Sequence, residues 1–209
     1  MSGELEREKD ILLFGGSFDP IHNGHLIVAR AVAEKLGVEK VVLIPSANPP
    51  HKQKMLLASA SDRLTMAQLA TADDKLFEVS DCELHREGPS YTLDTVRYFR
   101  EVYAPDVTLY WLIGADTVKE LSTWYEVGQL ADLCVIVTAR RPGFDQENLT
   151  CLSKVLTSAQ IDLLQRYILD TPLIDISATE IRRQIRESLP ILEQVPERVA
   201  EYIHSKSLY

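Results

Sequence analysis

The chain has 209 residues, 45% of them hydrophobic and 25% charged, which is typical of a folded globular protein. Its formal net charge of −9 argues against a polymeric nucleic acid as partner, because binding one depends on Lys and Arg side chains that neutralise phosphates. The three cysteines form no CxxC pair and no apolar stretch approaches 18 residues, so we expect a cytoplasmic protein with neither a disulfide framework, a zinc ribbon nor a membrane partner.

The first part of the chain has the pattern of a strand, a helix and a second strand. Residues 11–18 form an apolar run that ends in a glycine-containing turn, and residues 40–46 form a second run. Between them, residues 24–37 carry apolar side chains at helical spacing and end at Gly37. Strands that are apolar on both faces are typical of parallel sheets, so this segment predicts a βαβ unit.

The alternation continues to the end of the sequence. We expect further helices over residues 61–72, 92–103, 117–131, around 157–169, 177–188 and 196–208. We expect further strands over residues 77–84, 107–114, 133–140 and 172–177. This order predicts one α/β domain with a doubly wound, mainly parallel, Rossmann-like sheet over residues 11–176 and a small helical C-terminal portion over residues 177–209.

Polar segments follow several of the predicted strands. In doubly wound folds ligands bind beyond the carboxyl ends of the strands. The segments at these ends are residues 15–25, 45–52, 114–116 and 177–182. We therefore expect the four segments to converge on one rim of the sheet and to form a ligand site there.

The segment GGSFDPIHNGH, residues 15–25, has the residue types of a phosphate site. Gly15 and Gly16 would let a phosphate approach backbone N–H groups, and the N-terminus of the following helix would supply more. His22 and His25 are three residues apart, so both rings can point to one side. A zinc site is a weaker alternative because HxxH supplies only two ligands, and a plain turn with a capping histidine is another.

Two other loops carry charged residues that are candidates for ligand contacts. Lys52 and Lys54 follow the second strand and suit either phosphate contacts or a solvated basic loop. Asp116 follows Gly114 at a strand end, where a carboxylate would bind ribose hydroxyls, meet a water of a bound Mg²⁺, or cap the next helix.

Two helical segments add aromatic and cationic candidates. Trp124 and Tyr125 are neighbours in a predicted helix, so one of them should lie near the surface, where its ring could stack on a planar ligand; plain core packing is the alternative. Ser177, Thr179 and Arg182 open a later helix and form either an anion site or an ordinary capped helix start with solvated arginines.

Together these segments resemble the nucleotidyltransferase α/β-phosphodiesterase superfamily, which carries HxGH after the first strand and an ISSTxIR-like motif late in the chain. Here the two motifs are HNGH (22–25) and ISATEIR (176–182), with Ala178 where the family more often has Ser. Within the superfamily the chain is similar to the bacterial nicotinate-nucleotide adenylyltransferase family. The segments that carry this closer resemblance are NPPHK (48–52), SYTLDT (90–95), GADTVKELSTWYE (114–126) and RRPG (140–143).

The resemblance implies that ATP and nicotinate mononucleotide react to give deamido-NAD and pyrophosphate by direct in-line attack, with Mg²⁺ bound mainly through ATP. The implied catalytic residues are His22, His25, Lys52 and Arg182. The implied ATP-binding residues are Gly15, Gly16, Ser17, Phe18, His22, His25, Gly114, Asp116, Ser177, Thr179 and Arg182. The implied ligands of nicotinate mononucleotide are Ser17, Lys52, Thr92, Trp124, Tyr125 and Arg141.

Other functions share parts of this pattern. Phosphopantetheine adenylyltransferases have the same core but usually TxGH, and glycerol-phosphate-type cytidylyltransferases keep HxGH without the SYTLDT and STWYE segments. Nicotinamide mononucleotide differs from the acid only by an amide, so it is a close rival acceptor. A nucleotide-binding sensor without turnover is the alternative from another class, and a homo-oligomer stays open.

Overall fold

Six strands of the described residues form one sheet. The computed structural model of the chain describes residues 10–50, 57–140 and 146–209. The strands are β1 (Ile11–Gly16), β2 (Lys40–Pro45), β3 (Phe77–Val79), β4 (Leu109–Gly114), β5 (Val135–Arg140) and β6 (Ile168–Asp170). They lie in the order β3-β2-β1-β4-β5-β6, and every neighbouring pair is parallel. The predicted doubly wound, mainly parallel α/β sheet is confirmed.

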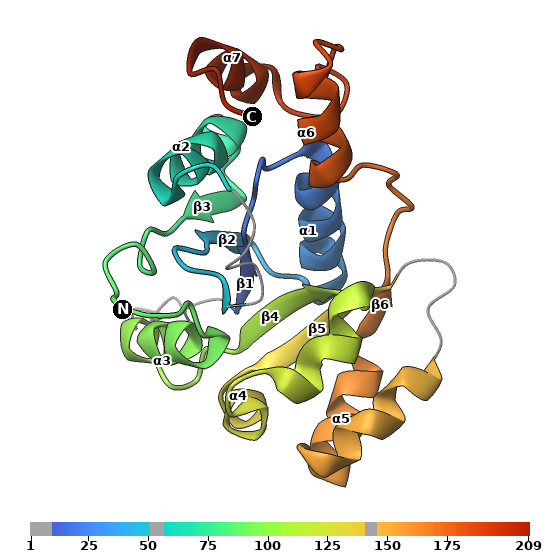
Figure 1. The fold of residues 1–209 in the computed structure, drawn as a ribbon. Coiled ribbons are helices and arrows are strands. Elements are labelled where there is room, and N and C mark those ends of the chain that lie inside the picture. The colour runs from blue at the N-terminus through green and yellow to red at the C-terminus, as the bar shows by residue number, and fades with distance from the viewer. Residues whose placement is uncertain (1–9, 51–56, 141–145) are drawn as a thin grey trace, which may run out of the picture.

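Helices cover both faces of this sheet (Figure 1). The helices on one face are α1 (Asn23–Leu36), α2 (Ala60–Thr71), α6 (Ala178–Arg186) and α7 (Glu197–Ser205). Those on the other face are α3 (Thr92–Val102), α4 (Val127–Leu133), α5 (Ser158–Arg166) and the 3₁₀ helices η2 (Ala115–Thr123) and η3 (Gln146–Lys154). In the described part of the chain, no helix is long and apolar enough to cross a membrane.

The central strands are apolar on both faces because helices cover both. Along β4, Leu109 and Trp111 pack with the helices on the α3 face, whereas Tyr110 and Leu112 pack with those on the α1 face. This alternation follows from the two-residue repeat of side-chain direction in a strand. Two buried clusters therefore hold the sheet from both sides.

Local chemistry sets several helix ends. Gly37 ends α1 with φ of 68°, in the left-handed region that glycine adopts at little cost. The Ser59 hydroxyl caps α2 by accepting a hydrogen bond from the backbone N–H of Asp62 over 3.0 Å. Ser177 caps α6 in the same way, and Pro196 lies directly before α7.

The strand order reverses between β1 and β4, which lie side by side at the centre of the sheet. After β1 the chain turns to α1 on one face, and after β4 it turns to η2 on the other. The two connections diverge and leave a crevice at the carboxyl ends of these strands, as expected at the switch point of such a fold.

The predicted helix over residues 117–131 is wrong. The structure divides this stretch into η2 and α4, with Trp124, Tyr125 and Glu126 between them. Glu126 has φ of 49°, a left-handed conformation that no α-helix continues through. Trp124 and Tyr125 are thus part of a connection, not successive residues of one helix.

Two strand predictions also differ from the structure. Residues 172–177 form no strand; β6 lies earlier, in the last part of the segment predicted as a helix around residues 157–169. The predicted strand over residues 77–84 is only three residues long, and it is an edge strand that pairs with β2. Short edge strands carry little periodic signal, because a single neighbour fixes them.

Candidate active site

Two cavities open at the carboxyl ends of the central strands. The first, of about 390 Å³, is lined by His22 and His25 and is called the histidine cavity. The second, of about 490 Å³, is lined by Trp111 and Trp124 and is called the tryptophan cavity. Residues 15–17 line both. The turn that follows β1 is therefore the wall that the two cavities share.

The two histidines are fixed against one another at the start of α1. The backbone N–H of His22 donates to Nδ1 of His25 over 3.2 Å, and the rings stack with centroids 3.6 Å apart. The Phe18 ring meets the His25 ring edge-on at 5.1 Å. Because Nδ1 of His25 accepts a hydrogen bond, the neutral ring carries its proton on Nε2, which can donate to a ligand. The prediction that both rings lie on one side is confirmed.

Glycines in this segment make room for neighbouring side chains. A Cβ atom on Gly15 would lie 2.6 Å from the Trp111 ring, closer than atoms can approach. A Cβ atom on Gly24 would lie 3.0 Å from the His22 ring and 3.1 Å from Ile174. From the sequence, Gly15 is explained by the close approach of a phosphate to the backbone. Its packing against Trp111 is a second reason for glycine at this position.

A buried polar cluster supports the shared turn. Asp19, which is 1% exposed, accepts hydrogen bonds at Oδ1 from the Ala58 backbone N–H over 3.0 Å and from the Tyr209 hydroxyl over 2.7 Å. Arg63, 2% exposed, donates to the backbone carbonyl oxygens of Ser17 over 2.7 Å and of Ala58 over 3.0 Å. Burial lowers the pKa of Arg63, and the charge of Asp19 opposes this shift. The cluster ties the turn to the start of α2.

The start of α6 lies beside the histidine cavity. Ser177 lines the cavity, and its hydroxyl accepts a hydrogen bond from the Glu180 backbone N–H over 3.2 Å. Arg182 donates from Nη1 to the backbone oxygen of Asp19 over 2.6 Å and from Nη2 to the Thr179 hydroxyl over 3.3 Å. A guanidinium is thereby held at the edge of the cavity, next to the helix N-terminus.

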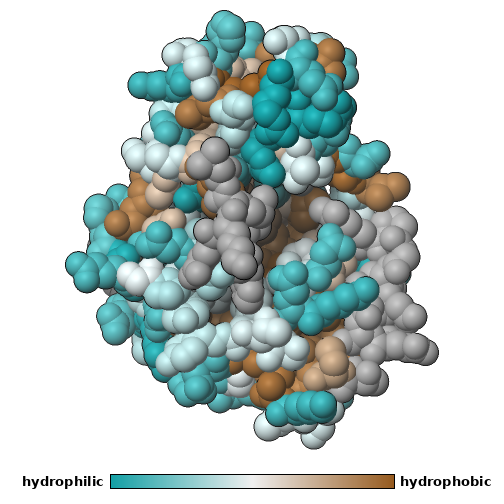
Figure 2. Space-filling model, in the orientation of Figure 1, coloured by the Kyte–Doolittle hydropathy of each residue, from teal (hydrophilic) through white to brown (hydrophobic). Residues whose placement is uncertain are grey.

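Arg183 does not line this cavity. It forms ion pairs with Glu180 and Glu187 on the same helix. Figure 2 shows a strongly hydrophilic surface over α6, in keeping with these charged side chains. Of the two adjacent arginines, only Arg182 is therefore a candidate for the site.

Trp124 and Tyr125 lie at the mouth of the tryptophan cavity. Trp124 is partly buried against the core, and its Nε1 atom is buried without a hydrogen-bond partner among the described residues. Tyr125 is 50% exposed and stacks on Tyr91, with ring centroids 4.6 Å apart and an angle of 26° between the planes. Thr92 lines the same cavity at the start of α3. The prediction that one of the adjacent aromatic residues lies near the surface is confirmed for Tyr125.

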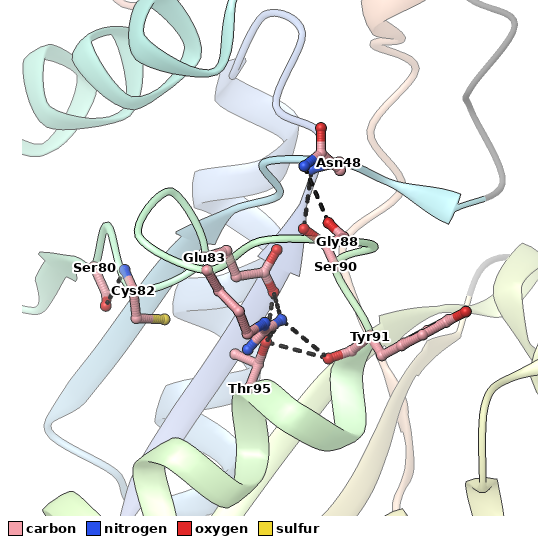
Figure 3. Close-up of polar contacts among 9 residues, drawn as sticks. Asn48, Ser80, Cys82, Glu83, Gly88, Ser90, Tyr91 and Thr95 are labelled. Atoms are coloured by element: carbon pink, nitrogen blue, oxygen red, sulfur yellow. Dashed lines mark hydrogen bonds and ion pairs between the residues drawn. The ribbon is translucent and has the colours of Figure 1, made fainter.

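A buried carboxyl group also lines the tryptophan cavity (Figure 3). Glu83 is 3% exposed, and its Oε1 accepts a hydrogen bond from the Thr95 hydroxyl over 2.6 Å. Nη2 of Arg86 donates to the same hydroxyl over 3.1 Å and lies 4.0 Å from Oε1 of Glu83. Oε2 of Glu83 has no hydrogen-bond partner in the part of the chain that the structure describes.

Two loops are joined along the edge of this cavity. Asn48 donates from its backbone N–H to the Ser90 hydroxyl over 3.0 Å and accepts from the Ser90 backbone N–H over 2.9 Å. Its side-chain amide donates to the Gly88 carbonyl oxygen over 3.0 Å (Figure 3). The described part of the loop after β2 is thus fastened at Asn48 to the segment that leads into α3.

The structure brings together most of the residues that the resemblance implies. The histidine cavity is lined by Gly15, Gly16, Ser17, Phe18, His22, His25, Gly114, Asp116 and Ser177. The tryptophan cavity is lined by Ser17, Thr92, Trp124 and Tyr125. Thr179 and Arg182 lie beside the histidine cavity, in contact with one another. Lys52, Lys54 and Arg141 lie outside the described residues, so their predicted contacts stay predictions.

Four residues of the site were missed from the sequence. They are Asp19, Arg63, Glu83 and Tyr209. Asp19 lies in the segment GGSFDPIHNGH, in which the histidines were the candidates for ligand contacts. Glu83 lies in a stretch that was predicted as a strand, with no motif around it. Arg63 and Tyr209 lie far from every motif, and only the folded chain brings them to the turn after β1.

No group of three or more His, Cys, Asp and Glu side chains in the described residues could hold a metal ion. Within the described ranges, the two histidines therefore belong to no such group. The arrangement offers instead hydrogen-bond donors and a cation, which suits an anionic ligand.

Comparisons with known proteins agree with this geometry. A model of the family described as cytidylyltransferase-like matches residues 13–184. A probable nicotinate-nucleotide adenylyltransferase of Moorella thermoacetica is 41% identical over 198 residues, which cover 94% of this chain and 90% of that protein. One of the same name from Neisseria meningitidis is 42% identical over 206 residues, covering 96% and 98%.

Solved structures share the fold. The nicotinic acid mononucleotide adenylyltransferase of Plasmodium falciparum, complexed with NaAD, superimposes with a TM-score of 0.75 at 20% identity, over 97% of this chain and 98% of that one. The same enzyme complexed with APC gives a TM-score of 0.73 at 20% identity, with the same coverage. At this identity the likeness extends to the fold alone.

Proposed function

The chain belongs to the cytidylyltransferase-like family and, within it, to the nicotinate-nucleotide adenylyltransferases, and we propose that it joins ATP and nicotinate mononucleotide to give deamido-NAD and pyrophosphate. The observation that carries this proposal is the pair of cavities that share the turn at residues 15–17. Each has the volume of a small-molecule site, and a transfer between two nucleotides needs two such sites with one common wall.

ATP occupies the histidine cavity in this proposal. The proton on Nε2 of His25 and the ring of His22 face the phosphates, and Arg182 meets the part that leaves as pyrophosphate. Gly114 and Asp116, at the end of β4, contact the adenosine half. Support comes from the donors and the guanidinium gathered around this cavity, since such groups stabilise charge on a transferring phosphoryl group.

Nicotinate mononucleotide occupies the tryptophan cavity. Its flat ring stacks against Trp124, with Tyr125 and Thr92 beside it. Support comes from the aromatic walls of this cavity and from the buried Nε1 atom of Trp124, which finds no partner among the described residues and can donate to a bound ligand. Glu83 adds a negative charge that suits the pyridinium ring of this nucleotide.

The reaction needs no general base. The 5′-phosphate of nicotinate mononucleotide is ionised at neutral pH, and one of its oxygens attacks the α-phosphorus of ATP. The new P–O bond forms as the bond to the β-phosphate oxygen breaks, and pyrophosphate leaves with that electron pair. The residues therefore act by positioning the two phosphates in line and by neutralising charge.

Mg²⁺ fits the histidine cavity through ATP. The ion would be held mainly by phosphate oxygens and water, and Asp116, an exposed carboxyl group that lines the cavity, can accept a hydrogen bond from a water ligand. Bound there, it would neutralise charge on the phosphates. We expect chelation of divalent metal to abolish turnover and to leave the melting temperature nearly unchanged, which calorimetry with and without chelator measures. A large fall in melting temperature would indicate a structural metal instead.

Product formation tests the proposal directly. The protein is incubated with ATP and Mg²⁺ and with one acceptor at a time: nicotinate mononucleotide, nicotinamide mononucleotide or phosphopantetheine. We expect pyrophosphate and a dinucleotide to form fastest with the nicotinate acceptor. Faster turnover with either other acceptor would assign the protein to that reaction. ATP binding without release of pyrophosphate from any acceptor would favour the sensor.

A further inference from the structure

Asp19 is the meeting point of three segments that lie far apart in the sequence. It follows β1, it contacts Arg182 of α6, and it contacts Tyr209, which follows α7. Figure 1 shows the end of the chain that is marked C beside α2 and α6, close to the connection between β1 and α1. The sequence gives no reason to connect Tyr209 with the phosphate motif.

The two oxygens of the Asp19 carboxyl group have different partners. Oδ1 accepts two hydrogen bonds, from the Tyr209 hydroxyl over 2.7 Å and from the Ala58 backbone N–H over 3.0 Å. Oδ2 faces Nη1 of Arg182 at 3.6 Å, which is longer than a hydrogen bond. The same Nη1 donates to the backbone oxygen of Asp19 over 2.6 Å. Arg182 is therefore anchored by a carbonyl oxygen and is not fully paired with the carboxylate.

This distinction affects how Arg182 can act. A guanidinium in a bidentate pair with a carboxylate has its charge and its donors taken up, so it binds a second anion weakly. The two donors on Oδ1 prevent that arrangement, because they hold the carboxyl group so that only Oδ2 faces Arg182, at a distance too long for a hydrogen bond. Burial and the neighbouring Asp19 charge raise the pKa of Tyr209, so its hydroxyl keeps its proton and stays a donor.

We propose that Tyr209 is a positioning residue for the ATP site: its hydroxyl restrains Asp19 and so leaves Arg182 available to the pyrophosphate part of ATP. The inference rests on the proposed function, in which Arg182 binds that part. Tyr209 contacts no substrate and acts through Asp19. Its ring and the neighbouring Leu208 pack against the buried cluster on the α1 face, so the hydroxyl is separable from the docking of this segment.

Tyr209→Phe tests the hydroxyl alone. The variant keeps the packed ring and removes one donor from Oδ1 of Asp19. We expect the Kd for inorganic pyrophosphate, measured by titration calorimetry, to rise about tenfold, the change expected for one hydrogen bond to a charged group. The KM for ATP should rise with it, and the KM for nicotinate mononucleotide should stay within twofold of the wild type.

Tyr202→Phe is the matched control. The Tyr202 hydroxyl donates to Oδ1 of Asp62 over 2.8 Å, so this variant also removes one bond between a tyrosine and an aspartate. That bond joins α7 to α2 and lies outside both cavities. We expect a similar change in melting temperature and an unchanged Kd for pyrophosphate. Equal pyrophosphate affinity in Tyr209→Phe and the wild type, or an equal loss in both variants, would overturn the proposal.

A double-mutant cycle separates restraint of Asp19 from any other effect of Tyr209. Asp19→Asn removes the charge that would capture Arg182, so Tyr209→Phe should weaken pyrophosphate binding by less than about threefold in that background. A full tenfold further loss would contradict the proposed route through Asp19. Because the probe is pyrophosphate and no acceptor is present, the result does not depend on which acceptor the enzyme uses. If the proposed reaction were wrong, the wild-type protein would form no dinucleotide in the assay of product formation, which is a separate measurement.

Discussion

The histidine cavity and the tryptophan cavity share one wall but differ in how their polar groups are held. In the histidine cavity, Nδ1 of His25 is bonded to the protein, and Arg182 is anchored on Asp19. In the tryptophan cavity, Nε1 of Trp124 and Oε2 of Glu83 are buried without hydrogen-bond partners among the described residues. The histidine cavity also has one buried oxygen without a hydrogen-bond partner among the described residues, Oδ2 of Asp19, but its donors are held in place by the protein. The tryptophan cavity keeps both a buried donor and a buried acceptor for a ligand.

The difference fits the separate tasks that we propose for the two cavities. Charge develops on the phosphates during transfer, so the groups that stabilise it act best when they are already in place. Recognition of the acceptor instead gains from buried polar groups that only the right ligand satisfies, because a wrong ligand leaves them unpaired. The first cavity should therefore govern turnover, and the second should govern the choice of acceptor.

The largest effect is expected from the preorganised cavity. His25→Ala removes a fixed donor to the transferring phosphate and should lower kcat by about 10²-fold or more, with little change in either KM. Steady-state kinetics measures this split. His85→Ala is the control, because His85 is an exposed histidine paired with Asp81 outside both cavities. Near-wild-type kcat in His25→Ala would remove this residue from the phosphate site.

A smaller effect, on the KM for one substrate and not on kcat, is expected from the aromatic side chains of the tryptophan cavity. Trp124→Ala removes the surface on which the pyridine ring stacks, so the KM for nicotinate mononucleotide should rise by about tenfold or more. The KM for ATP should change by less than about twofold. Trp124→Phe should recover part of the loss, since it restores a flat ring. Equal increases in both KM values would mean that the two cavities do not bind different substrates.

The smallest effect is expected from the buried carboxyl group. Glu83→Gln keeps the shape of the side chain and an oxygen that can accept from Thr95, but it removes the negative charge that faces a pyridinium ring. We expect the KM for nicotinate mononucleotide to rise roughly threefold, with kcat nearly constant. Glu87→Gln is the control, because Glu87 is exposed on the same connection. An unchanged KM would leave Glu83 with a purely structural role beside Thr95.

The sequence predicted the fold well where the signal is strong. The four central strands and most helices lie where apolar runs and 3.6-residue patterns indicated, because helices bury both faces of those strands. The prediction failed at residues 117–131, where one left-handed residue breaks a helical pattern. It placed an edge strand correctly at β3 but made it too long, and it placed the strand β6 too late in the chain. Such short segments depend on a neighbouring strand more than on their own residues.

The residues of the candidate site also divide into those that the sequence predicted and those that only the structure shows. Its histidines, its α6 segment and Trp124 stand in recognisable motifs, and the structure brings them to the two cavities. Glu83 and Arg63 are single charged residues in ordinary surroundings, and their burial follows only from the way that several segments close over them.

The sequence by itself determined the doubly wound sheet and the rim where its polar segments gather, because both follow from local periodicity and from the direction of parallel strands. Only the tertiary structure decided that one turn is shared by two cavities, and that Tyr209 reaches Asp19 across 190 positions of the chain. Contacts at such a separation have no local signal: they arise when independently stabilised segments pack together, and that packing determines which charged groups are buried and which remain available to a ligand.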